Sequence, residues 1–230
     1  MTTLDLTKSL ALGLACAGTD NASLVIDAFT SPPLGQAASL VSTLDGAVSA
    51  PCYATGLSDV LGGSRDILIQ LTHTTGTSNI TALANQDAGV FKFNNDLLST
   101  STCSLTWDAN GVGLKQDFSA EPGLLLFSAS NDHAATYKIT IRTFGLGSSS
   151  AIINAPEGYG QNLAFPFGDF TADIITGADL TQIDSVSLYI SGGNALDVNI
   201  DAVTTIPEPS TAGLAMLGIG AFGLARRRRN

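Results

Sequence analysis

Three oxygen-bearing side chains, Asp197, Asn199 and Asp201, alternate with apolar residues near the end of the chain. Alternate residues of a strand point to the same face of a sheet, so this spacing places the three side chains together. Carboxylate and amide oxygens are ligands that Ca²⁺ accepts. The pattern is typical of a solvated strand face and also allows a structural Ca²⁺ ion, which is the one cofactor that we consider.

Aromatic side chains are the second group that could serve a ligand, because their flat faces stack on sugar rings. The candidates for sugar stacking are Trp107, Tyr53, Tyr159 and Tyr189. The whole chain contains one Trp and four Tyr, so packing in the core and at its rim accounts for these residues equally well. Sugar binding is therefore a hypothesis at this point.

Residues for catalysis are harder to find. The two histidines, His73 and His133, stand 60 residues apart, and neither belongs to an HExxH motif or a His/Cys cluster. This spacing supports neither metal catalysis nor a histidine-based triad. We predict no catalytic residues and expect a protein that is not an enzyme.

The charge distribution excludes one class of partner. Between residues 24 and 206 the chain has five basic residues against 17 acidic ones. A body this acidic repels a phosphate backbone, so we expect no nucleic-acid binding. Solubility alone explains the acidity.

The cysteines bear on the compartment. Cys16 falls near the N-terminus, which leaves Cys52 and Cys103 in the body of the chain. A single pair in an exported protein is a candidate disulfide, and two buried free thiols are the alternative.

Residues 1–23 have the features of a secretory signal peptide. Lys8 precedes a short apolar stretch, Ser9–Ala17, although Asp5 is unusual in such a position. Ala15 and Ala17 supply a small-residue cleavage site, and a cut near residues 21–23 is the alternative. The segment predicts export.

Residues 206–230 form the most distinctive segment. Pro207-Glu208-Pro209 is extended and not helical, because each proline fixes its own φ and disfavours helix in the residue before it. The next stretch, Thr211–Ala225, carries no charge and predicts a helix that is hydrophobic on all sides, which suits lipid. As a helix it spans about 22 Å, short for a permanent anchor. The arginine cluster that follows is Arg226, Arg227, Arg228 and Arg229, and such a cluster stays on the cytoplasmic side.

This order of Pro-Glu-Pro, apolar helix and terminal arginines resembles the PEP-CTERM sorting signal. The resemblance implies an exported protein of a Gram-negative bacterium that makes exopolysaccharide, with its tail recognised by exosortase, a membrane protease. Pro207, Glu208 and Pro209 would then be the sorting motif, and Arg226 to Arg229 would retain the tail in the inner membrane. The body would lie in the periplasm until release to the cell surface or the extracellular matrix.

Alternation of apolar and polar residues recurs between residues 24 and 205. A period of two predicts strands that bury one face, and glycine-containing pairs mark the turns between them. The alternating apolar positions are Ile67, Ile69 and Leu71; Phe91 and Phe93; Leu105 and Trp107; Tyr137, Ile139 and Ile141; Val186, Leu188 and Ile190; and Leu196, Val198, Ile200 and Ala202. We predict an all-β domain, an antiparallel two-sheet sandwich.

The order of segments resembles a jelly roll of the galactose-binding type, as in several carbohydrate-binding modules. The segments that carry this resemblance are Leu61–Asp66, Ser104–Asp108, Phe165–Phe170, Asp179–Thr181 and Leu196–Ala202. We expect a non-enzymatic envelope or matrix protein, associated with exopolysaccharide. A carbohydrate-binding module that recognises exopolysaccharide is the alternative, and a glycan-degrading enzyme is a further one.

Overall fold

The computed structural model describes residues 23–31, 36–85 and 88–206. Strands and short 3-10 helices account for the regular structure of these ranges. In chain order they are β1 (Val25–Asp27), β2 (Gln36–Ser42), β3 (Cys52–Thr55), η1 (Leu61–Gly63), β4 (Ser64–Thr74), β5 (Ser78–Asn85), β6 (Val90–Asn94), β7 (Ser99–Trp107), β8 (Gly123–Asn131), β9 (Ala135–Thr143), β10 (Gly147–Ala155), β11 (Gly158–Pro166), η2 (Phe167–Asp169), β12 (Thr171–Ala172), η3 (Leu180–Gln182), β13 (Ser185–Gly192), β14 (Asp197–Ile200) and β15 (Ala202–Thr205).

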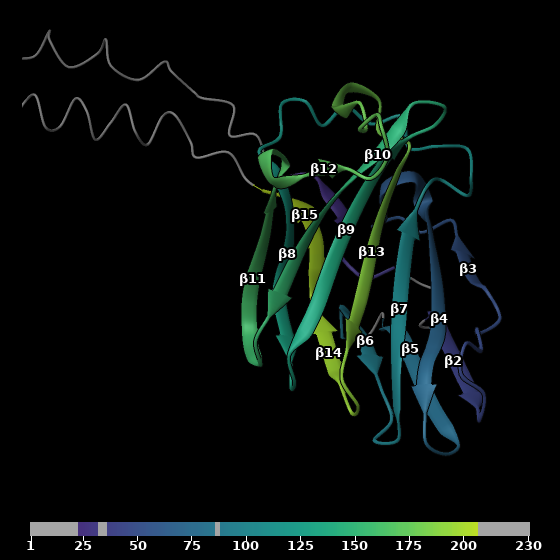
Figure 1. The fold of residues 1–230 in the computed structure, drawn as a ribbon. Coiled ribbons are helices and arrows are strands. Elements are labelled where there is room, and N and C mark those ends of the chain that lie inside the picture. Colours follow the sequence, from purple (N-terminus) through teal and green to yellow (C-terminus); the bar gives the residue numbers. More distant parts are fainter. Residues whose placement is uncertain (1–22, 32–35, 86–87, 207–230) are drawn as a thin grey trace, which may run out of the picture. The chain divides into compact units, whose positions relative to one another are not determined.

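The strands of the described residues form two antiparallel sheets that pack face to face (Figure 1). The eight-stranded sheet has the order β1-β15-β8-β14-β6-β5-β2, with β11 also paired to β8. The seven-stranded sheet has the order β12-β10-β9-β13-β7-β4-β3. The chain passes repeatedly from one sheet to the other, which is the wiring of a jelly roll. The predicted all-β two-sheet sandwich is confirmed.

The core lies between the sheets and is built by the alternation seen in the sequence. Ile67, Ile69 and Leu71 of β4 are at most 1% exposed, and Tyr137, Ile139 and Ile141 of β9 are buried on the same inner face of the seven-stranded sheet. Phe91 and Phe93 of β6 supply large side chains from the opposite sheet. Burial of these rows on both inner faces stabilises the sandwich from Leu24 to Ile206 as one compact unit.

The last predicted strand differs in one respect. Leu196, Val198 and Ile200 point inward as expected, but the chain bends at Asp201. The bend divides the segment into β14 and β15 and exchanges the faces, so that Val203 is buried in place of Ala202. Strict alternation through Ala202 was therefore wrong: β14 and β15 both pair with β8, but the strand on their other side changes from β6 to β1 at this bend.

The predicted disulfide between Cys52 and Cys103 is not formed, since both thiols are free. Cys52 lies on β3 and Cys103 on β7, and β4 runs between these two strands. Two strand spacings amount to about 9.6 Å, beyond the Cα separation that a disulfide spans. Of the alternative, two buried free thiols, the structure gives both thiols as free, but only Cys103 is buried and Cys52 is partly exposed.

A reductant should therefore leave the stability of the sandwich unchanged. We expect residues 24–206 to show the same unfolding midpoint with and without dithiothreitol, and to titrate two free thiols after denaturation. Burial raises the pKa of Cys103, so its thiol should react only once the chain unfolds. A midpoint that falls on reduction would show that the two cysteines pair.

The two terminal segments lie outside the described residues. These are the predicted signal peptide up to residue 22 and the tail from Pro207 to Asn230, with the sorting motif, the apolar helix and the arginine cluster. Within the ranges that the structure describes, no helix has the length and apolar character needed to cross a bilayer.

Candidate functional site

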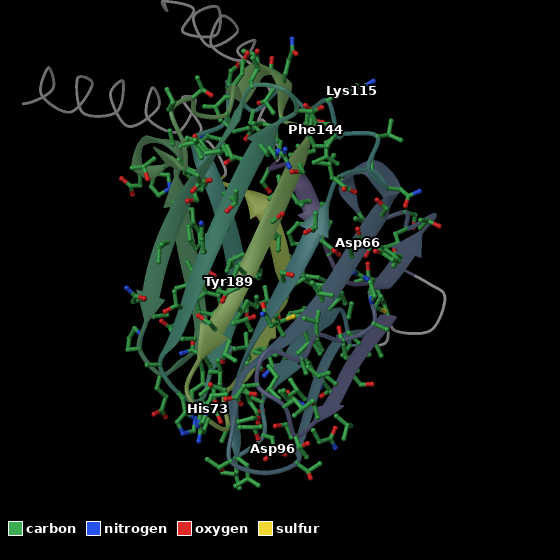
Figure 2. The ribbon with its side chains drawn as sticks, turned by 45° about the vertical axis from the view of Figure 1, so that its right-hand side comes forward. Asp66, His73, Asp96, Lys115, Phe144 and Tyr189 are labelled. Atoms are coloured by element: carbon green, nitrogen blue, oxygen red, sulfur yellow. The ribbon has the colours of Figure 1, made fainter. Side chains whose placement is uncertain are left out.

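The outer face of the seven-stranded sheet carries hydroxyl groups in register. One row across the strands contains Thr140, Ser187 and Thr106, and it continues to Asp66 and Tyr53 at the edge. Directly opposed side chains on neighbouring strands are about 5 Å apart, so the hydroxyls form a continuous polar surface. Thr106 Oγ1 and Ser187 Oγ are 3.2 Å apart, within hydrogen-bonding distance. Figure 2 shows this face, with Asp66, Tyr189 and Phe144 on it.

A cleft of about 690 Å³ opens at one end of this face. Its floor is formed by the outward residues of β7, β9 and β13. Its walls are the turn between β9 and β10 and the segment after β12. The lining residues that matter here are Thr106, Asp108, Thr140, Arg142, Phe144 and Ser187. The cleft therefore combines hydroxyl groups, one carboxylate, one guanidinium and one aromatic ring with the aliphatic side chains of Leu146 and Ile174.

The wall of the cleft depends on close packing of two backbones. A Cβ at Gly147 would lie 2.1 Å from the carbonyl oxygen of Thr176, so only glycine lets the two segments approach this closely. The hydroxyl of Thr176 donates to the carbonyl of Leu146 at 2.6 Å. At the start of the turn between β9 and β10, the N–H of Phe144 donates to Asp184 Oδ2 at 2.7 Å and holds the turn in place.

Arg142 and Phe144 form the charged and aromatic part of the cleft. The guanidinium carbon lies 5.7 Å from the centroid of the Phe144 ring, which is a cation–π distance. Among the described residues, no carboxylate lies within ion-pair distance of Arg142. Its donors are therefore available to a ligand in the cleft.

Two carboxylates lie on the other side of the cleft, Asp108 in its lining and Asp66 on the neighbouring strand. Partial burial raises the pKa of Asp66, and the negative charge of Asp108 raises it further. The native state thus binds a proton at Asp66 more tightly than the unfolded chain does.

This raised pKa predicts a pH-dependent effect of replacing Asp66. Protonated Asp66 stabilises the native state relative to the unfolded chain at pH values below its ordinary pKa of 3.8. This stabilisation is lost as the pH rises through the raised pKa of the native state. Asp66→Asn should therefore raise the melting temperature at pH 7 by roughly 1–2 °C, a small effect because the group is partly solvated. At pH 3 the variant should match the parent. Differential scanning calorimetry at both pH values checks this, and a variant destabilised at pH 7 would contradict it.

The arrangement suits a polyhydroxylated ligand. Sugar hydroxyls both donate and accept, and Thr, Ser, Asp and Arg side chains supply complementary partners. The exposed face of an aromatic ring packs against the apolar face of a pyranose. The cleft therefore has the chemistry to bind a saccharide.

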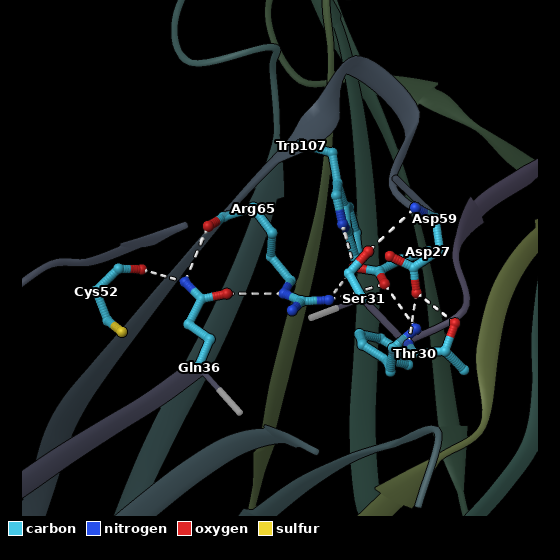
Figure 3. Close-up of polar contacts among 9 residues, drawn as sticks. Asp27, Thr30, Ser31, Gln36, Cys52, Asp59, Arg65 and Trp107 are labelled. Atoms are coloured by element: carbon cyan, nitrogen blue, oxygen red, sulfur yellow. Dashed lines mark hydrogen bonds and ion pairs between the residues drawn. The ribbon is translucent and has the colours of Figure 1, made fainter. Parts of the chain in front are cut away.

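Trp107 does not belong to this site, so its prediction as a stacking residue was wrong. Its side chain is fully buried on the inner face of β7, and its Nε1–H donates to Asp27 Oδ2 at 2.8 Å. Figure 3 shows Trp107 within a polar network between the sheets. The period of two that places Leu105 inward places Trp107 inward as well.

The same network holds a buried ion pair. Asp27 is fully buried, Arg65 is 3% exposed, and Arg65 Nη1 donates to Asp27 Oδ2 at 2.6 Å. Burial raises the pKa of Asp27, against the opposing effects of Arg65 and of the N–H donors of Trp107 and Phe29. Gln36 Oε1 accepts from Arg65 Nε at 2.8 Å. These contacts join strands of both sheets and have a structural role.

The three tyrosines are exposed but are not gathered in one place. Tyr53 is on β3 and Tyr189 on β13, with β7 and β4 between them on the same face. Tyr159 is on β11, in the other sheet. None of the three lines the cleft described above. Their role in sugar stacking stays a prediction.

The candidate Ca²⁺ residues lie on β14, an interior strand of the eight-stranded sheet, and on the bend that follows it. Asp197 and Asn199 lie on the solvent side of β14, opposite Asn94 and Lys92 of β6, and Asp201 is at the bend. Burial and the nearby Asp132 raise the pKa of Asp197. In the part of the chain that the structure describes, no group of three His, Cys, Asp or Glu residues is arranged to hold a metal ion.

The sequence analysis did not identify the residues of the cleft as a site, although the alternation of apolar and polar residues already indicated that some of them face solvent. The alternation in β9 and β13 already placed Thr140, Arg142, Ser185 and Ser187 on a solvated face. The missing information was the strand order, since β9, β13 and β7 are neighbours in space and distant in sequence. Asp108 and Phe144 follow strand ends and had no periodic signal.

Comparison with known families concerns the tail. Residues 205–229 match the model of the PEP-CTERM protein-sorting motif. The resemblance of the tail to this sorting signal is thereby confirmed. The chain carries the signal of an exported protein with a membrane-anchored sorting tail, of the kind processed by exosortase.

Comparison of the sandwich with solved structures gives distant similarities. The family 11 carbohydrate-binding module of a cellulosomal cellulase of Clostridium thermocellum has 11% identity, covering 81% of this chain and 95% of that chain, with a TM-score of 0.43. The family 30 module of another cellulosomal cellulase of that organism has 11% identity, 80% and 98% coverage, and a TM-score of 0.42. An exo-beta-agarase has 14% identity, 82% and 25% coverage, and a TM-score of 0.38. No curated protein matches the sequence. Similarities this distant do not extend to a site or a ligand.

Proposed function

We propose that this protein is a non-enzymatic component of the cell envelope or extracellular matrix, delivered by exosortase. The match of residues 205–229 to the sorting motif carries this proposal. In this scheme exosortase recognises Pro207, Glu208 and Pro209, and the arginine cluster retains the tail until cleavage. The body then lies in the periplasm and is released to the surface or the matrix.

The sandwich, in this proposal, binds exopolysaccharide through the cleft on the seven-stranded sheet. The observation that supports it is the cleft itself, in which the unpaired Arg142, the ring of Phe144 and the hydroxyls of Thr140 and Ser187 converge. The net negative charge of the body disfavours a strongly anionic polymer, except where Arg142 can meet an acidic substituent. A neutral or sparsely acidic polysaccharide fits these charges best.

The sorting part is tested by mass spectrometry of the C-terminus of the protein recovered from its host. We expect the mature chain to end near Pro207–Pro209. A variant with Gln in place of Arg226 to Arg229 should leave more of the chain uncleaved or mislocalised. Recovery of the intact chain, arginines included, from the cytosol would reject the sorting route.

The binding part is tested with residues 24–206 and the polysaccharide of the host. We expect retention of the sandwich on immobilised polymer, with release by soluble polymer. Incubation of the same mixture, followed by chromatography of the polymer, should show no shortening. Retention with shortening would identify a glycan-degrading enzyme, and absence of retention would reject the proposed ligand.

A further inference from the structure

The segment Asp173–Ala178, which follows β12, exposes two large apolar side chains. Ile174 is 73% exposed and Ile175 is 97% exposed, the highest value among the large apolar side chains of the described residues. Leu146, on the adjoining turn between β9 and β10, is 58% exposed. We refer to Leu146, Ile174 and Ile175 as the apolar tip.

The apolar tip is held in place by hydrogen bonds to β10. The N–H of Asp173 donates to the carbonyl of Ser148 at 3.0 Å, and the N–H of Ala178 donates to Ser149 Oγ at 3.0 Å. The hydroxyl of Thr176 holds the middle of the segment against Leu146. The two isoleucines therefore project from a fixed backbone and do not find cover within the described sandwich.

The segment of the apolar tip carries no unpaired charge of its own, although Leu146 and Ile174 line the same cleft as Arg142. Residues 174–178 carry no charge. The carboxylate of Asp173 accepts from the hydroxyl of Ser150 and lies 3.6 Å from Lys138 Nζ. Residues 174–178 can thus leave water without taking a charge of their own with them.

The apolar tip lies at the end of the sandwich where the described chain ends. The N–H of Ile206 donates to the carbonyl of Gly123, and Gly123 pairs with Pro166, the last residue of β11. From Pro166 the chain runs through η2 directly into β12 and the apolar tip. Figure 1 shows β12 and the end of β11 at the same end of the sandwich.

The length of the remaining chain connects this end with the bilayer. Five residue steps separate Ile206 from Thr211, where the uncharged stretch of the tail begins. A fully extended chain covers no more than about 18 Å in five steps. While the uncharged stretch is in the bilayer, the end of the sandwich that carries the apolar tip must stay close to the lipid surface.

We propose that the apolar tip inserts into the lipid interface while the tail is anchored, and so fixes the orientation of the sandwich on the membrane. Isolated apolar side chains at an interface bind weakly alone, and a second anchor makes such contacts persistent. The inference rests on the membrane-anchored stage of the proposed function. It leaves the opposite end of the sandwich, with Leu97, directed away from the lipid.

The experiment uses the full chain reconstituted into vesicles of phosphatidylethanolamine and phosphatidylglycerol that contain a lipid brominated on its acyl chains. A tryptophan is introduced as Ile175→Trp in one protein and as Leu97→Trp in the matched control, where Leu97 is 75% exposed. The native Trp107 is buried and contributes the same background to both. We expect bromine to remove about half of the added fluorescence at position 175, as for a side chain at the headgroup boundary, and almost none at position 97.

Each outcome bears on the proposal. Vesicle flotation with quenching at position 175 alone supports it. Flotation without quenching at position 175, or with equal quenching at both positions, overturns docking and leaves the anchored tail intact. Absence of flotation overturns the anchored stage together with the docking. A last outcome is that bromine does not quench position 175 in pure lipid, and that position 175 is shielded from solvent only in membranes that contain exosortase. This outcome would assign the apolar tip to the protease and overturn its assignment to lipid.

Discussion

Replacing Arg65 by methionine is expected to lower the free energy of unfolding of the sandwich by about 3–5 kcal/mol. The substitution keeps most of the side-chain volume but leaves the carboxyl group of Asp27 buried without its cation. That carboxyl is fully enclosed and retains only the N–H donors of Trp107 and Phe29. Urea unfolding of residues 24–206 measures the loss.

The control is Arg142→Met, because Arg142 is exposed and has no ion-pair partner among the described residues. It should change the free energy of unfolding by no more than about 0.5 kcal/mol. Adding Asp27→Asn to Arg65→Met should recover part of the loss, since the buried group is then neutral. A loss below about 1 kcal/mol for Arg65→Met would mean that the pair contributes little.

Affinity for polysaccharide should depend on Arg142, although stability does not. Arg142→Ala removes a charged hydrogen-bond donor from the cleft, at a cost of about 1.5–3 kcal/mol, or roughly a tenfold to hundredfold loss of affinity. Phe144→Ala removes the ring and should cost about 0.5–1.5 kcal/mol. Affinity electrophoresis in gels that contain the host polysaccharide measures both.

Two comparisons make this result specific to the cleft. Leu97 directly follows Asp96, which lies at the end of the sandwich opposite Phe144 (Figure 2), so Leu97→Ala should bind as the parent does. Arg142→Lys should retain part of the affinity, because it keeps the charge and loses the planar set of donors. Parent-like affinity in Arg142→Ala, with the fold intact, would show that the ligand binds elsewhere.

The sandwich follows from its sequence because the core obeys a rule of period two. Ile67, Ile69 and Leu71 identify an inward row without knowledge of any neighbour, and Tyr137 to Ile141 do the same. The rule fails at Asp201, where a bend exchanges the faces. At this bend the strand on one side of the segment changes from β6 to β1, and pairing partners are not local information.

The site was less predictable for the same reason. Trp107 was selected as a stacking residue because it is aromatic. It lies two residues after Leu105 on the same strand, and this spacing assigns both side chains to the core. Arg142 was recognised as an outward residue, but its neighbours Thr106 and Ser187 come from strands far away in the chain. The disulfide prediction rested only on the expected export of the protein and on the presence of two cysteines in its body. The spacing of Cys52 and Cys103 in the sequence does not reveal that β4 lies between their strands.

Strand β1 pairs with β15, so the first and last strands of the sandwich are side by side. The N–H of Thr205 donates to the carbonyl of Leu24, and the sheet is incomplete until both partners are present. On the export route proposed for this protein, β15 would be the last strand of the sandwich to cross the membrane. The domain would then close only when its final residues emerge, and a tail held in the bilayer would keep the nascent sheet in place during this last and most non-local step of folding.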